Sequence, residues 1–98
     1  FISVMEPSQR PRERLLDFGP AALSDAELLS VLLRTGRRGQ GAVAESHRLL
    51  AEFGGLAGIA RLDLRELLGQ TGIGPAKAAT VAAAFEVGQR LATLQALS

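Results

Sequence analysis

The chain contains no cysteine, no tryptophan and no tyrosine, and only four of its residues are phenylalanine. Without cysteine, disulfides and thiolate metal sites are excluded, and we expect a reducing, cytoplasmic setting. Without tyrosine and tryptophan, we do not expect a base-stacking surface of the kind that single-strand binders use.

Long apolar runs are also missing. No stretch approaches the roughly 18 apolar residues that a membrane span needs, and the N-terminus lacks the basic and apolar pattern of a signal peptide. We therefore expect a soluble protein without a membrane partner. Its 98 residues, of which 47% are hydrophobic, suffice for one modest core. The sequence predicts one domain over residues 10–98, preceded by an unassigned N-terminal arm, residues 1–9.

Catalytic groups are scarce. His47 is the only histidine, so a zinc site built on two or more histidines is excluded, and we predict neither a metal nor a cofactor. The carboxylates are scattered, and several are explained as helix caps. No pair is placed for acid–base catalysis, and no serine lies in a pattern with a base that suggests nucleophilic catalysis. We expect no catalytic residue in this chain.

Helix start and stop signals dominate the first half. Pro11 predicts the first turn of a short helix, which Gly19-Pro20 ends. Three apolar side chains of this region are expected to pack on the core: Leu15, Leu16 and Phe18. The capping box Ser24-Asp25-Ala26-Glu27 then predicts a second helix, ending near Thr35-Gly36. A third helix is expected over residues 42–53, with Gly54-Gly55 as its stop.

The second half continues in the same way. Residues 55–60 are expected to form a short helical turn, and Asp63 caps the helix that follows it. The last helix starts at Pro75, and its apolar residues recur at steps of three and four: Ala78, Val81, Ala82, Phe85 and Ala92. Glu86 and Arg90 are expected to pair across one turn. No segment is typical of a strand, so the sequence predicts a compact all-α domain of five to six helices.

The turn between these last two helices is rich in glycine. Gly72 and Gly74 flank one apolar residue, and Pro75 suits the first position of a helix because its missing N–H would be unpaired there. Such a turn presents backbone N–H groups at a helix N-terminus, where an anion such as phosphate is favoured. Lys77 adds a positive charge within reach. The alternative is a plain connection between two helices.

Between Arg34 and Arg48 the chain has four arginines and one acid, so its middle is locally basic, although the net charge is only +1. Arg37 and Arg38 lie in a loop that begins with Arg34-Thr35-Gly36, which matches Gln70-Thr71-Gly72. A unit of helix, glycine turn and helix is therefore predicted twice, and the second copy has the tighter turn. We expect the two turns to fall on one side of the core, which would place both arginines near the amides of the second turn.

The second turn and its flanks resemble the helix-hairpin-helix motif, by which many DNA repair proteins hold the phosphate backbone. The residues that carry the resemblance are Leu67-Leu68, Gly72-Ile73-Gly74-Pro75-Ala76-Lys77, Ala78-Ala79 and Val81. The resemblance implies that DNA is contacted by six residues: Gly72, Ile73, Gly74, Pro75, Ala76 and Lys77. With Arg37 and Arg38, these residues would neutralise about two to four phosphates, so binding is expected to be weak, salt-dependent and independent of base sequence.

A closer resemblance is to the N-terminal region of the bacterial RadC family. It rests on five segments: Arg10-Pro11-Arg12-Glu13-Arg14-Leu15-Leu16, Leu23-Ser24-Asp25-Ala26-Glu27-Leu28-Leu29, Leu32-Leu33-Arg34-Thr35-Gly36, Phe53-Gly54-Gly55-Leu56 and Gly72-Ile73-Gly74-Pro75-Ala76-Lys77-Ala78. The resemblance implies an association with DNA repair. It also implies a metal-dependent JAB (MPN-type) domain further along the full-length protein, which would be an intramolecular partner. The enzyme would then lie outside this chain.

Two functions follow from the sequence. The first is non-specific binding of the DNA backbone through the hairpin, as the DNA-targeting part of a RadC-like protein. The second is a docking or dimerising module that positions the metallopeptidase-like domain. Leu91, Leu94 and Leu97, spaced by three on the last predicted helix, favour the second because they form an apolar row without a predicted partner.

Overall fold

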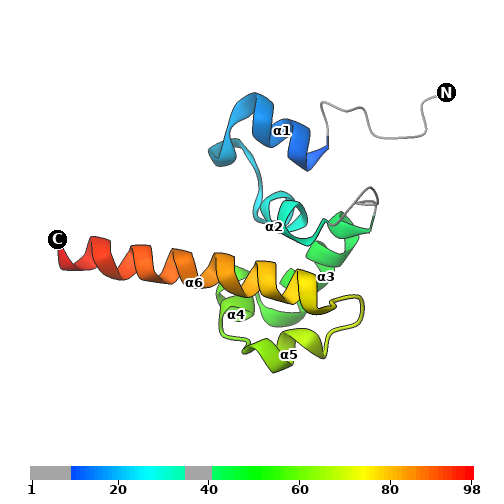
Figure 1. Cartoon of the computed structure of the whole chain (residues 1–98). Coiled ribbons are helices and arrows are strands. Elements are labelled where there is room, and N and C mark those ends of the chain that lie inside the picture. Colours follow the sequence, from blue (N-terminus) through cyan, green and yellow to red (C-terminus); the bar gives the residue numbers. More distant parts are fainter. Residues whose placement is uncertain (1–9, 35–40) are drawn as a thin grey trace. The chain divides into compact units, whose positions relative to one another are not determined.

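The computed structural model describes residues 10–34 and 41–98, and these ranges are all-α (Figure 1). They contain six α-helices and one short 3-10 helix, and no strand occurs among them. The predicted fold class is confirmed. None of the helices in the described ranges is both long enough and apolar enough to cross a membrane. The chain divides into two compact units, Phe1–Arg48 and Leu49–Ser98, which are taken separately below.

The first unit opens with α1, Pro11–Phe18, as the proline predicted. Gly19 ends the helix with a φ of 88°, and its N–H donates to the Leu15 carbonyl. The 3-10 helix η2, Pro20–Ala22, leads to α2, Asp25–Leu33. The predicted capping box is confirmed: the Glu27 N–H donates to the Ser24 hydroxyl at 3.1 Å, and the Ser24 N–H donates to the Glu27 carboxylate at 2.9 Å.

An ion pair links α1 to α2. Arg14 Nε lies 2.7 Å from Glu27 Oε2, and the Arg14 guanidinium also donates to the Ala22 carbonyl at 3.2 Å. The same guanidinium lies over the Phe18 ring, 5.8 Å from its centroid. The Ser24 N–H, with Arg14 as a second cause, lowers the pKa of the Glu27 carboxyl. Polar contacts of Arg14 thus fix α1 against α2.

The predicted packing of α1 was wrong for two residues. Leu16 and Phe18 are 74% and 62% exposed, and only Leu15 is half-buried. Adjacent positions on a helix lie about 100° apart, so a helix that turns Leu15 inward turns Leu16 outward. The buried residues of this unit lie mainly in and next to α2 and in the first turns of α3, Ala42–Phe53: Leu23, Ala26, Leu29, Ser30, Leu33, Ala42 and Ser46. Both buried serines donate to backbone carbonyls of their own helices.

Helix α3 crosses from the first unit into the second and stops at the predicted glycines. Gly54 and Gly55 have φ angles of 80° and 93°, and both of their N–H groups donate to the Leu50 carbonyl. The chain then forms α4, Leu56–Ala60. Within α4, Gly58 is buried against the end of α3, and a Cβ at this position would lie 1.5 Å from the Phe53 carbonyl oxygen. This contact requires glycine.

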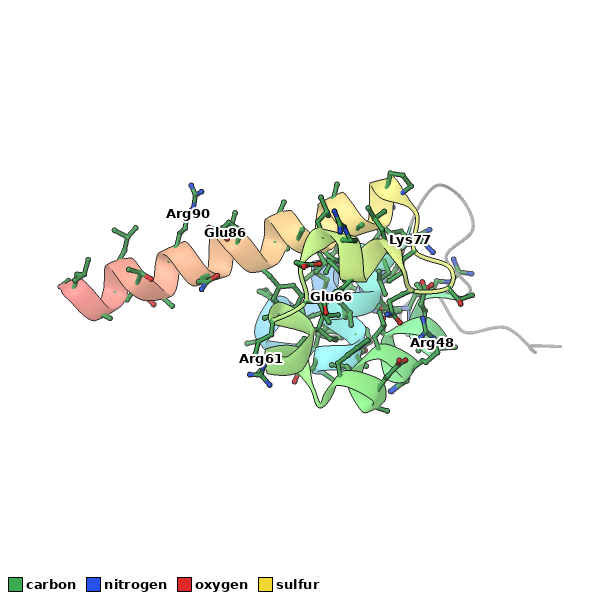
Figure 2. All side chains as sticks on the ribbon, turned by 90° about the horizontal axis from the view of Figure 1, so that it is seen from below. Arg48, Arg61, Glu66, Lys77, Glu86 and Arg90 are labelled. Atoms are coloured by element: carbon green, nitrogen blue, oxygen red, sulfur yellow. The ribbon has the colours of Figure 1, made fainter. Side chains whose placement is uncertain are left out.

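The second unit continues with α5, Leu64–Leu68, and α6, Pro75–Leu97, which pack against each other. Its buried apolar residues come from four helices and the last turn: Leu49, Ile59, Leu67, Ile73, Ala78 and Val81. Only the first part of α6 contributes to this core, because every residue from Glu86 onward is exposed. The predicted pair of Glu86 and Arg90 is confirmed, with 2.9 Å between Arg90 Nε and the carboxylate (Figure 2).

Candidate functional site

The glycine turn that the sequence singled out is framed by α5 and α6. A second capping box starts α5: the Glu66 N–H donates to the Asp63 carboxylate at 2.7 Å, and Glu66 Oε1 accepts from the Asp63 N–H at 2.8 Å. Gly69 follows α5, and its N–H donates to the Arg65 carbonyl. These bonds fix the helix that leads into the turn, and Leu67, which is 2% exposed, ties that helix to the core.

The turn is closed by backbone hydrogen bonds and held by one apolar side chain. The Ile73 N–H donates to the Gln70 carbonyl at 3.1 Å. Gly72 has a φ of 85°, a conformation that favours glycine. Ile73 is 4% exposed, so its side chain anchors the turn and does not face a ligand. Sequence reasoning missed the part played by Gln70, because a backbone acceptor leaves no trace in the residue type.

Gly74 is the N-cap of α6, and its surroundings are open. Its backbone is extended, with φ −91° and ψ −174°, and no heavy atom outside its immediate chain neighbours in the described ranges lies within 4 Å of a Cβ built on it. Having no side chain, it cannot cap the helix. Ala78 is the first residue of α6 to donate within the helix, to the Gly74 carbonyl at 2.9 Å. The first turn, which begins with Pro75, contains no acid.

Lys77 brings positive charge to this helix start. Its Nζ donates to the Gly72 carbonyl at 3.3 Å, across the turn, and the residue is half-buried. Figure 2 shows Lys77 beside the turn at the beginning of α6. Of the six predicted hairpin residues, Gly72, Gly74, Pro75 and Ala76 are exposed. The hairpin therefore combines an open helix N-terminus with an ammonium group, the combination that suits a phosphate.

The other two predicted site residues, Arg37 and Arg38, lie outside the described ranges. Their predicted approach to the hairpin stays a prediction. His47 is exposed on α3. Residues 10–34 and 41–98 hold no group of three or more histidine, aspartate or glutamate side chains that could bind a metal ion.

Comparison with known proteins places this chain beside one family. The sequence model described as UPF0758 N-terminal matches residues 2–79. A UPF0758 protein of Methylibium petroleiphilum is 54% identical over 81 residues, which cover 83% of this chain and 36% of the relative. A UPF0758 protein of Halorhodospira halophila is 52% identical over 82 residues, 84% of this chain and 37% of the relative. No solved structure matches the chain.

A UPF0758 protein of a Roseiflexus species is similar over a longer stretch, with 48% identity over 90 residues, 92% of this chain and 39% of the relative. The chain thus spans little more than a third of the length of these relatives. The matched family region ends at residue 79, within α6, and the helix continues to Leu97.

Proposed function

This chain belongs to the UPF0758 family through its N-terminal domain, and we propose that the domain binds the phosphate backbone of DNA through the hairpin Gly72–Lys77. Binding does not depend on base sequence, because the contacts come from backbone amides and an ammonium group. In the whole protein, the domain serves to bring the remaining chain to DNA. Any catalytic activity belongs to that remaining chain, as the resemblance to RadC implies.

One observation carries the proposal: the fold does not need a glycine at position 74. The backbone of Gly74 is extended, which any residue adopts, and a Cβ there would meet no neighbour. Serine, aspartate or asparagine would cap α6 better. Ser24 and Asp63 cap α2 and α5 in this way, whereas Arg10 before α1 and Gly55 before α4 make no side-chain cap. A helix start without a side-chain cap, with Lys77 beside it, suits an external anion.

The affinity is expected to be low. In residues 49–98 the four basic side chains (Arg61, Arg65, Lys77 and Arg90) are balanced by four acids (Glu52, Asp63, Glu66 and Glu86). The hairpin alone would therefore neutralise about one or two phosphates, and Arg37 and Arg38 would raise this to about two to four. The logarithm of the binding constant should then fall with the logarithm of salt concentration with a slope of roughly −2 to −4.

The test is a titration of fluorescently labelled duplex DNA with the chain and with Gly74→Asp, at several salt concentrations. The new carboxylate would accept from amides in the first turn of α6 and repel phosphate. We expect at least about a tenfold loss of affinity, while the helix content measured by circular dichroism stays unchanged.

Gln89→Glu is the matched control, because it adds the same charge at an exposed position of α6 far from the turn. We expect it to lower the affinity less than about twofold, since a charge more than about 10 Å away is largely screened at 0.1 M salt. Equal losses in the two variants would show a response to overall charge only. Unchanged binding by Gly74→Asp would remove the hairpin from the interface.

A further inference from the structure

The C-terminal half of α6 carries large apolar side chains that are more than half exposed. We define the α6 stripe as four residues, Val87, Leu91, Leu94 and Leu97, which are 66%, 52%, 64% and 79% exposed. In Figure 1 this half, orange to red, runs on beyond α4 and α5 of the same unit. Exposed apolar side chains are common singly, but a row of four on one helix indicates a contact surface.

The stripe is not a continuation of the buried side of α6. At about 100° per residue, Val87, Leu91 and Leu94 fall within about 60° of one another. The buried side, marked by Ala78 and Val81, lies about 140° further round the helix. The helix therefore has two apolar sectors, one used by the core of residues 49–98 and one left open.

Neither apolar sector is packed against the core within residues 86–97, so core packing does not explain why this segment is helical. A helical segment of this length is marginal in water, and most helices gain their stability from packing an apolar face. The Glu86–Arg90 pair adds little, because both side chains are more than half exposed. Gly88, in the same segment, weakens the helix further. The helical conformation of residues 86–97 would therefore be stabilised by a partner that packs against an apolar face.

We propose that the α6 stripe docks an apolar surface in the part of the longer UPF0758 protein that lies outside residues 1–98. The relatives are more than twice as long as the matched region. The matched family region ends at residue 79, so the stripe lies beyond it. The occupant is thus tethered to the helix it covers. This inference does not depend on phosphate binding by the hairpin.

The size of the stripe favours a tethered partner over a second copy of the chain. Four side chains of this kind bury roughly 240–480 Å² when fully covered. A stable complex between separate molecules needs about 800 Å² from each partner. A tethered segment needs less, because a short linker gives an effective concentration in the millimolar range, about a thousandfold above usual solution concentrations.

The test compares hydrogen exchange in residues 86–97 between two proteins. One is the 98-residue chain, and the other is the same chain joined to the C-terminal portion of the Methylibium petroleiphilum relative, in place of that protein's own N-terminal domain. We expect the amides of this segment to exchange at least about tenfold more slowly in the longer protein. The double variant Leu91→Glu with Leu94→Glu should remove this protection.

The matched control, Ala92→Glu with Ala96→Glu, places the same charges on the other side of the helix and should keep the protection. Equal exchange in the short and long proteins would overturn the proposal. So would a concentration-dependent dimer of the 98-residue chain, seen by sedimentation and abolished by Leu91→Glu, because the occupant would then be a second copy. If the joined protein does not fold, the relative's own full-length protein and its N-terminal fragment give the same comparison.

Discussion

Two glycine-rich turns lie in residues 49–98, and they use glycine for opposite reasons. In the first, Gly54 and Gly55 adopt positive φ angles, and Gly58, in the helix α4 that follows, lies against the Phe53 carbonyl oxygen. In the second, Gly72 also has a positive φ, but Gly74 is extended and open. In the first turn, the fold itself requires the glycines. The second turn leaves one glycine that the fold does not require.

The difference teaches that the number of glycines in a turn says little about binding. What matters is whether the backbone angle or the packing already requires glycine. At Gly58 the space of the missing side chain is filled by backbone, so the glycine serves packing. At Gly74 it is empty and borders an uncapped helix start, so the space is available to a ligand. Substitutions at individual glycines can therefore separate the two roles.

The largest effect is expected for Gly58→Ala. The added methyl group would overlap the Phe53 carbonyl, so α4 must move away from the end of α3. We expect a loss of at least about 2–3 kcal/mol of unfolding free energy, measured by urea denaturation. Gly88→Ala is the control, since it is also helical but open, and it should stabilise by about 0.5–1 kcal/mol. Equal effects would mean that the close contact is not present.

A smaller loss is expected for Gly72→Ala. Its φ of 85° costs a residue with a side chain about 1–2 kcal/mol, and the turn that holds Ile73 in the core would loosen. Thermal melting of this variant beside Gly69→Ala measures the difference, because Gly69 has a negative φ of −76° and should tolerate alanine. A neutral Gly72→Ala would contradict the described turn.

The smallest effect on stability, and of opposite sign, is expected for Gly74→Ser. The extended backbone accepts serine, and the hydroxyl would cap α6, so we expect a gain of a few tenths of a kcal/mol in urea denaturation. Affinity for DNA should fall at the same time, since the hydroxyl competes for the amides. A destabilised variant would show that the fold does need glycine at this position, and the comparison between the two turns would collapse.

The helix boundaries could be predicted because they depend on local chemistry. The capping box at Ser24, the cap at Asp63 and the start at Pro75 are all found where the sequence placed them. These signals work within four residues, through bonds that the side chain makes to its own backbone. The same holds for the end of α3 at Gly54.

Burial was harder to predict, because it depends on contacts distant in sequence. Leu16 and Phe18 are apolar and yet exposed, and Ala92 matches the period of α6 and is also exposed. The need for glycine at position 58 was missed because its neighbour is a carbonyl, which every residue has. In the hairpin, residue types predicted the bare helix start, whereas the burial of Ile73 and the Lys77 contact to Gly72 required coordinates.

Because α6 is continuous, the hairpin and the α6 stripe have a fixed orientation relative to each other about the helix axis. The hairpin at Lys77 and the stripe at Leu91 belong to one unbroken helix, about 21 Å apart along its axis at 1.5 Å per residue. Inserting one residue near Gly88 would rotate the stripe by about 100° relative to the hairpin, while inserting four would nearly restore its direction. With both proposed surfaces occupied, α6 would set the angle between the docked part of the longer protein and the phosphate backbone at the hairpin.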